Sequence, residues 1–379
     1  MIPFLDLRAQ YHSIKDEIDG AIAEVLESSQ FVLGKEVAAF EEEFAAYCGG
    51  GQAIGVNSGT SALHLALLAA GVGAGDEVIT TPFTFAASVA TIHYCGATPV
   101  FADLDPATFN LDASRLSALV TEKTKVILPV HLYGQPAEMD TIQEVARTHG
   151  LVVIEDAAQA HGAEYRGRRV GSLADMACFS FYPTKNMGAY GEAGAVVTAN
   201  AEFAASLRRL RNWGQTKRYE HAIRGYNYRM EGLQGAILRV KLRHVEAWTE
   251  ARRALARAYD HGLRGAGVVT PHALPHVRHV YHAYTIRAPH RDALAAGLNA
   301  AGIQASVHYP IAVHLQPAYR DPRYAEGSLP MAEQAAREVL SMPIYPELRP
   351  DQVAEVCAAV ARLTSSGSSA TPAHSPALA

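Results

Sequence analysis

Asp156 and Lys185 occupy positions that are typical of catalytic or ligand-binding side chains rather than of solvated surface charges. Asp156 ends the apolar run Leu151–Asp156, which places a carboxylate at the carboxyl edge of an expected sheet, where ligand sites of α/β proteins lie. Lys185 follows a second apolar run, Cys178–Phe181, in a loop of aromatic and small residues. A partly desolvated amine titrates lower than usual and can form a Schiff base. Taken singly, a loop lysine or aspartate is more often a solvated charge.

A third feature lies upstream, in the stretch Val56–Gly71. A strand ends there, Asn57-Ser58-Gly59 forms a tight turn, and a helix begins at Thr60 or Ser61. Free N–H groups at a helix start bind phosphate well, although simple helix capping by Ser58 or Thr60 explains the pattern equally well. Pyridoxal 5'-phosphate (PLP) needs a phosphate site, a carboxylate for its ring nitrogen and a lysine for its aldehyde. The three features together therefore predict a PLP site.

These residues require a scaffold that brings distant segments together. Short apolar runs alternate with helix-like stretches from about Gln52 to Asn200, which predicts an α/β fold with a mostly parallel sheet covered by helices on both faces. The last two runs are joined without a helix, so we expect one antiparallel strand. The seven runs are Ala53–Val56, Glu77–Thr80, Thr98–Leu104, Lys125–Val130, Leu151–Asp156, Cys178–Phe181 and Gly194–Ala199.

The remainder of the chain predicts a second, smaller domain. Good helix formers at Leu233–Leu263 predict one long connecting helix. The elements expected after it are strands at Val280–Ala288 and Gln304–Tyr309 and helices at Arg291–Gly302, Met331–Val339 and Asp351–Leu363. We therefore expect a PLP-binding large domain with an N-terminal helix at residues 1–245, a small α+β domain at 246–363 and a disordered tail at 364–379.

Composition and charge argue against several classes of protein. Lys and Arg total 33 and Asp and Glu total 38, so the net charge of −5 lacks the basic footprint of a nucleic-acid-binding protein. No apolar run is long enough to cross a membrane, and Asp6 lies early in a start that does not resemble a secretory signal. The four cysteines form no CxxC pair, so we expect no metal site and a reduced, cytoplasmic protein.

One glycine-rich stretch imitates a dinucleotide-binding loop. Gly71–Asp76 reads GVGAGD, but it follows a helix and precedes a strand, the reverse of the order that the dinucleotide fingerprint requires. A helix end followed by a turn explains it better. A nicotinamide-dependent oxidoreductase is therefore disfavoured.

The motifs resemble the DegT/StrS family of sugar aminotransferases, a branch of the fold-type I PLP enzymes, over nearly the whole chain from Ile2 to Leu363. Asp-x-x-Gln-x-x-Gly and Pro-x-Lys-x-x-Gly are the most specific of them. The segments that carry the resemblance are VNSGTSAL, EVITTPFTFAAS, PVHLYGQPAEMD, VIEDAAQAHGA, FSFYPTKNMGAYGEAGAVVT, NYRMEGLQGAIL and VHYPIAVHLQPAY.

The resemblance implies roles for eight cofactor residues. Lys185 would bind PLP and move the proton, Asp156 would pair with the ring nitrogen, and Gln159 would contact the ring hydroxyl. Asn227 would reach the phosphate from a neighbouring subunit, which makes the active site a property of a homodimer. Phe85 would stack on the cofactor ring, and Gly59, Thr60 and Ser180 would bind its phosphate.

Substrate residues are predicted in the same way. His308, Tyr309 and His314 fall where the family approaches sugar or nucleotide, although ordinary core or surface histidines fit the pattern as well. Arg218 and Arg229 are candidates for a carboxylate or a diphosphate, because the guanidinium fork suits both. Tyr182 is a candidate for the pocket wall, with simple packing as the alternative. Glu192 and Ala193 depart from the family's usual Asp-Gly, so we expect the longer carboxylate and the lost glycine to change how the turn behind Lys185 closes.

The implied reaction moves an amino group from L-glutamate to a nucleotide-linked ketosugar. The motifs look closest to enzymes that aminate C3 of dTDP-3-keto-6-deoxyhexoses. Amination at C4, a UDP-linked ketosugar and a ketocyclitol stay open, as does a regulatory protein that keeps the fold without turnover. Family members that act as dehydratases carry His at the Schiff-base position, so Lys185 argues against that activity.

Overall fold

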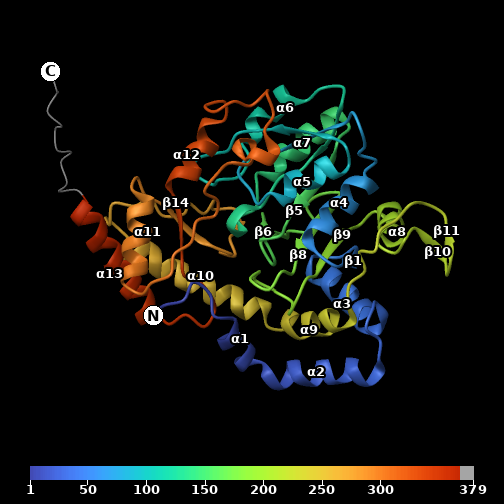
Figure 1. Cartoon of the computed structure of the whole chain (residues 1–379), viewed down its shortest axis with the longest axis horizontal. Coiled ribbons are helices and arrows are strands. Elements are labelled where there is room, and N and C mark those ends of the chain that lie inside the picture. The colour runs from blue at the N-terminus through green and yellow to red at the C-terminus, as the bar shows by residue number, and fades with distance from the viewer. Residues whose placement is uncertain (368–379) are drawn as a thin grey trace.

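A seven-stranded sheet forms the centre of the molecule in the computed structural model, which describes residues 1–367 (Figure 1). Its strands are β1 (Gln52–Val56), β2 (Glu77–Thr80), β3 (Thr98–Phe101), β4 (Thr124–Ile127), β5 (Val152–Asp156), β8 (Met176–Ser180) and β9 (Gly194–Thr198). They follow the order β1–β9–β8–β5–β4–β2–β3, and every neighbouring pair is parallel except the two that include β9. The predicted sheet and its expected antiparallel strand are confirmed.

Helices cover both faces of this sheet. They are α3 (Gly34–Tyr47), α4 (Gly59–Ala69), α5 (Ala87–Tyr94), α6 (Leu116–Leu119), α7 (Met139–His149), α8 (Ala201–Leu210) and α9 (Gly232–Leu242). Successive side chains of a strand point to opposite faces. In β8, Phe179 therefore packs on Phe44 of α3 with ring centroids 5.0 Å apart, whereas Cys178 joins the core that contains Leu65 of α4. Burial on both faces explains why the strands are apolar throughout.

The long helix predicted at Leu233–Leu263 is two helices. Helix α9 ends at Leu242, the residues Arg243 and His244 interrupt the helix, and α10 (Val245–Gly262) follows. Both residues at the break contact Glu17 of α2 (Lys15–Ser28), each at 2.9 Å. Helix α9 packs on α2 and α3, whereas α10 packs on α13 (Pro350–Gly367). No glycine or proline marks the break, so the sequence pattern alone could not predict it.

A second core lies in the C-terminal part of the chain. Strands β13 (Tyr284–Arg287) and β14 (Val339–Met342) pair antiparallel, and α10, α11 (Arg291–Ala300) and α13 surround them. Ile2, at the start of the chain, also packs in this core. The predicted division at residue 245 stays a prediction, and it coincides with the first residue of α10.

Three details of the C-terminal prediction are corrected. The strand expected at Gln304–Tyr309 is wrong, because only Ser306 forms a bridge, with Ser341. The predicted last residue of α12 (Pro330–Glu338), Val339, instead begins β14. Residues 364–367, expected in the disordered tail, continue α13, where the Thr364 hydroxyl donates to the Val360 carbonyl. The rest of that tail, residues 368–379, lies outside the described residues.

Short elements complete the described chain. They are α1 (Leu7–Ser13), β6 (Glu164–Tyr165), β7 (Arg168–Arg169), β10 (Gln215–Lys217), β11 (Glu220–His221) and β12 (Val277–Arg278), with 3-10 turns at Ala113–Arg115, Leu132–Gly134, Val313–Leu315 and Pro317–Tyr319. The β10–β11 hairpin projects from the body of the molecule beyond α8 (Figure 1). Within residues 1–367 no helix is long and apolar enough to span a membrane.

Candidate active site

A cavity of about 550 Å³ opens at the carboxyl ends of β5 and β8, beside the start of α4. Its walls come from segments far apart in sequence, as expected for a site at this edge of an α/β sheet. Ten of the predicted site residues line it: Gly59, Thr60, Phe85, Asp156, Gln159, Ser180, Tyr182, Lys185, His308 and Tyr309.

The N-terminus of α4 forms one end of this cavity. Ser58 is the helix cap, since its side chain accepts from the Ser61 N–H at 3.0 Å, and Gly59 and Thr60 begin the first turn. N–H groups of a first helical turn have no partner within the helix. A Cβ on Gly59 would lie 2.5 Å from the Cβ of Ser180, so only glycine lets the helix start approach the strand this closely. The resulting pocket of N–H and hydroxyl groups suits a phosphate.

Asp156 is fixed in the floor of the cavity with 5% of its surface exposed. The Ser88 hydroxyl donates to Oδ2 at 2.7 Å, and the Ala158 N–H donates to Oδ1 at 3.2 Å. Burial raises the pKa of the Asp156 carboxyl, which these hydrogen bonds and the charge of Lys185 partly offset. A buried carboxylate in this setting is stabilised further by a cationic partner such as a protonated ring nitrogen.

Lys185 supplies the amine of the cavity. It lies on the loop after β8, and burial lowers the pKa of its ammonium group, against the opposing effect of the Asp156 charge. Among residues 1–367, no side chain or carbonyl forms a hydrogen bond with its Nζ. The amine is therefore available to an incoming carbonyl, which is the requirement for a Schiff-base lysine.

Gln159 connects the floor of the cavity to the C-terminal part of the chain. Its Oε1 accepts from the Tyr133 N–H at 2.6 Å, and its Nε2 donates to the Tyr309 hydroxyl at 3.1 Å. The amide is therefore held in one orientation. Tyr309 in turn lies 6.1 Å, between ring centroids, from Phe85 on the opposite wall.

Four predicted residues lie outside this cavity. Arg218 is on the β10–β11 hairpin and contacts Tyr219, while Asn227 is exposed and bridges to Asn212. Arg229 donates to Asn212 Oδ1 at 3.1 Å. His314 is buried in the core, with its Nε2 3.3 Å from Glu333. None of the four reaches the cavity of its own chain.

Ser88 and His282 are among the cavity residues that sequence reasoning missed. Ser88, which orients Asp156, lies on α5 within a run of small residues that carries no distinguishing signal. His282 lines the cavity near Lys185, but it lies in a stretch that the sequence indicated only as a strand. Glu192, singled out only as a departure from the family pattern, lines the cavity as well.

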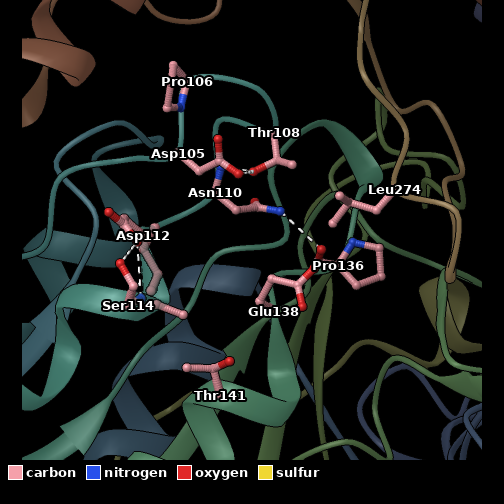
Figure 2. Close-up of a pocket in the computed structure, with 12 residues that line it drawn as sticks. Asp105, Pro106, Thr108, Asn110, Asp112, Ser114, Pro136, Glu138, Thr141 and Leu274 are labelled. Atoms are coloured by element: carbon pink, nitrogen blue, oxygen red, sulfur yellow. Dashed lines mark hydrogen bonds between the residues drawn. The ribbon is translucent and has the colours of Figure 1, made fainter.

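A second cavity, of about 310 Å³, lies between the Asp105–Ser114 loop and Pro136–Glu138. Figure 2 shows that its polar groups bind one another: Asn110 donates to the Pro136 carbonyl at 3.1 Å, and the Ser114 hydroxyl donates to Asp112 at 2.6 Å. It contains no lysine or histidine. The Lys185 cavity is therefore the stronger candidate for an active site.

Comparisons with known proteins agree with this choice. A model of the DegT/DnrJ/EryC1/StrS aminotransferase family matches residues 12–361. A pleiotropic regulatory protein of Geobacillus stearothermophilus is 51% identical over 93% of this chain and 95% of its own length. A dTDP-3-amino-3,4,6-trideoxy-alpha-D-glucose transaminase of Streptomyces venezuelae is 48% identical over 95% of each chain.

The solved structures give the same result. The crystal structure of Streptomyces venezuelae DesV in complex with a ketimine intermediate is 47% identical, with a TM-score of 0.94 over 96% of this chain and 98% of that chain. The predicted fold-type I architecture and the family resemblance are thereby confirmed. The chain belongs to the DegT/DnrJ/EryC1/StrS aminotransferase family.

Proposed function

We propose that this protein moves the amino group of L-glutamate to C3 of a dTDP-3-keto-6-deoxyhexose. The single observation that carries the proposal is the cavity that unites the Lys185 amine, the Asp156 carboxylate and the start of α4. Membership of an aminotransferase family and relatives that are dTDP-sugar 3-transaminases support the reaction class.

Pyridoxal 5'-phosphate is the cofactor, since the chain belongs to an aminotransferase family whose solved neighbours include pyridoxal and pyridoxamine phosphate forms. When bound, it supplies an electron sink for the carbon that loses or gains a proton. The residues present fit it, because glycine at position 59 lets the start of α4 lie against Ser180, where a Cβ would clash, and so brings N–H and hydroxyl groups together for a phosphate. Thr60 and Ser180 offer hydroxyl groups, Gln159 offers an amide, and Phe85 offers a ring face.

Lys185 and Asp156 carry the proton chemistry of the proposal. A lowered pKa leaves more of the Lys185 amine neutral, so that its Nζ can take a proton from the reacting carbon and return it. Asp156 stays at the floor, where its charge favours a protonated ring nitrogen. The same amine serves both the amino donor and the sugar, which predicts ping-pong kinetics.

We propose further that two subunits share each active site. L-glutamate brings two carboxylates and a nucleotide brings a diphosphate, yet Lys185 is the sole Lys or Arg among the cavity-lining residues. Arg218, Arg229 and Asn227 do not line the cavity of their own chain, and Arg218 lies on the β10–β11 hairpin, which projects from the body (Figure 1). Phe85 and Tyr182 at the cavity are 59% and 47% exposed, as expected for a wall that a partner completes.

A cytoplasmic location is part of the proposal. Cys48, Cys95, Cys178 and Cys357 all lie within the described residues and form no disulfide there. Burial raises the pKa of each thiol, which makes them inert structural cysteines.

A regulatory role is the second candidate, favoured by the 51% identical relative, a pleiotropic regulatory protein. The cavity argues for turnover, because a protein without turnover has no need of a free Lys185 amine beside a buried Asp156. The two candidates make different predictions for a purified protein, so a direct assay separates them.

The assay offers the PLP-loaded protein L-glutamate and a panel of keto sugars, with products identified by mass spectrometry. The panel contains 3-keto and 4-keto dTDP-6-deoxyhexoses, UDP-linked 3-keto sugars and a ketocyclitol, and Lys185→Ala is the control. We expect an amine on the dTDP-3-keto sugar and 2-oxoglutarate in equal amount. Amination of another panel member would replace the proposed substrate, and PLP binding without any amine product would favour the regulatory role.

A further inference from the structure

His282 is held on the cavity wall by its backbone and by one edge of its ring. Its N–H donates to the Tyr133 carbonyl at 2.8 Å, and its Nδ1 lies 3.1 Å from Oδ1 of Asn186. Asn186 is buried behind the wall and does not line the cavity, whereas His282 does. The opposite edge of the imidazole, which carries Nε2, therefore faces the cavity.

The neighbouring amide fixes the tautomer of this histidine. Nδ2 of Asn186 donates to the Val280 carbonyl at 3.2 Å, so the oxygen of the amide must face His282. An amide oxygen only accepts, which requires Nδ1 of His282 to carry the hydrogen. Nε2 then carries a lone pair, and among residues 1–367 it has no hydrogen-bond partner. His282 thus offers the cavity a positioned, unused hydrogen-bond acceptor.

This imidazole stays neutral. Burial, reinforced by the charges of Lys185 and Arg252 and by His308 and His161, lowers the pKa of His282 well below its ordinary value. A group that resists protonation is a poor relay for protons but a lasting acceptor. His308 on the same wall is also held neutral, since burial lowers its pKa to about 4.

The chemistry of the two substrates decides which of them His282 serves. The donor group of L-glutamate is its amine, which is consumed in the bond to the cofactor, and its two carboxylates are acceptors that cannot pair with a lone pair. A ketosugar carries hydroxyl groups on the carbons that flank its carbonyl. Lys185, which must reach the reacting carbon, lies close enough to influence the pKa of His282.

We propose that His282 is a specificity-determining residue whose Nε2 accepts a hydrogen bond from a sugar hydroxyl next to the reacting carbon. The inference rests on the proposed function and deepens it. In this proposal the cavity wall of one subunit recognises the sugar ring. The charged groups that recognise a carboxylate or a diphosphate are separate from it. A site that is built to bind a hydroxyl discriminates against an analogue that lacks it.

The test separates the two half-reactions in His282→Phe, which keeps a planar ring but removes the acceptor. Loss of PLP absorbance on mixing with L-glutamate measures the first half-reaction. Its return on mixing the aminated enzyme with dTDP-3-keto-6-deoxyglucose measures the second. We expect the sugar half-reaction to slow by about tenfold to a hundredfold, the effect of one lost hydrogen bond, with the glutamate half-reaction within about twofold of wild type.

Two variants complete the design. His282→Gln places an amide oxygen near the position of Nε2 and should recover part of the sugar rate; it also carries the test if the Phe variant does not fold. Tyr281→Phe is the matched control, because Tyr281 is adjacent in sequence but does not line the cavity, and it should behave as wild type. PLP absorbance confirms the folded, loaded state of each variant.

A substrate analogue supplies the last comparison. The 2-deoxy and 4-deoxy forms of the sugar each lack one hydroxyl next to the carbonyl. With the form that lacks the recognised hydroxyl, the sugar half-reaction of wild type should slow by the same factor as the His282→Phe substitution causes. The rate of His282→Phe should not change between the parent sugar and this deoxy form. Equal slowing of both half-reactions, or no slowing of either, would overturn the role of His282. A wild-type enzyme that completes the glutamate half-reaction but aminates no sugar would instead contradict the proposed function.

Discussion

Two lysines of this chain, one fully buried and one half-buried in a cavity wall, have opposite surroundings. Lys241, on α9, is 0% exposed, and its Nζ donates to the Gly188 carbonyl at 2.6 Å and to Gln10 Oε1 at 3.0 Å. The same ammonium lies 4.1 Å from the centroid of the Tyr190 ring. Lys185 lines the active-site cavity and, within residues 1–367, has no hydrogen-bond partner for its Nζ.

Burial lowers the pKa of both amines, to about 7 for Lys241. A lowered pKa therefore does not by itself identify a Schiff-base lysine. The difference lies in whether the amine is free and whether it shares a cavity with Asp156. Lys241 instead acts as a structural tie, because Gly188 belongs to the loop that follows Lys185 and Gln10 belongs to α1.

The largest expected effect comes from replacing each of the two lysines in turn. Lys185→Ala removes the proton-transfer group, so turnover should fall by about 10²- to 10⁴-fold or more, and the absorbance band of lysine-bound PLP should disappear. Lys241→Met should retain that band. If the band survives in Lys185→Ala and is lost in a folded Lys241→Met protein, the assignment of Lys185 as the PLP-binding lysine is wrong.

A smaller effect is expected from Ser88→Ala, which alters the cavity of Lys185 and leaves the surroundings of Lys241 unchanged. The Ser88 hydroxyl lowers the pKa of Asp156, so its removal should raise that pKa. We expect the acid limb of the kcat/KM profile to move to higher pH and kcat to fall by about tenfold, as for one hydrogen bond to a buried carboxylate. An unchanged pH profile would show that Ser88 does not control this carboxyl.

The third expected effect concerns stability and not the active site. In the unfolded chain Lys241 has its ordinary pKa of 10.5, and in the folded protein it has a pKa of about 7. Between these values the unfolded state binds more protons, so this lysine makes folding more favourable as pH rises. The free energy of unfolding of wild type minus that of Lys241→Met should therefore increase from pH 7 towards pH 10 in urea denaturation. A difference that is flat or falls with pH would contradict the assigned burial.

The comparison also shows what the sequence could predict. Asp156, Lys185 and the start of α4 follow apolar strands, and strand ends in a parallel sheet meet at one edge, so local pattern was enough to bring them together. Ser88 and His282 act through contacts with Asp156 and Asn186 that join distant segments, and no local spacing encodes such contacts. The break between α9 and α10 was missed for the same reason.

Some residues predicted from the family resemblance are not joined to the cavity within one chain. Arg218, Arg229 and Asn227 have the chemistry expected of phosphate or carboxylate ligands, but none of them lines the cavity of its own Lys185. Arg218 lies on the projecting hairpin, and Arg229 bridges to Val56 at the end of β1. His314 packs instead against Glu333 in the core. Sequence motifs identify such residues without stating which subunit's site they serve, so their roles stay predictions.

The most direct test of the account is to locate the lysine that binds PLP. The PLP-loaded protein is reduced with borohydride, which makes the Schiff base permanent, and is then digested and mapped by mass spectrometry. The account predicts the pyridoxyl phosphate mass on the peptide that contains Lys185, and none on the peptide that contains Lys241. A label on Lys241, or on any lysine other than Lys185, would contradict it.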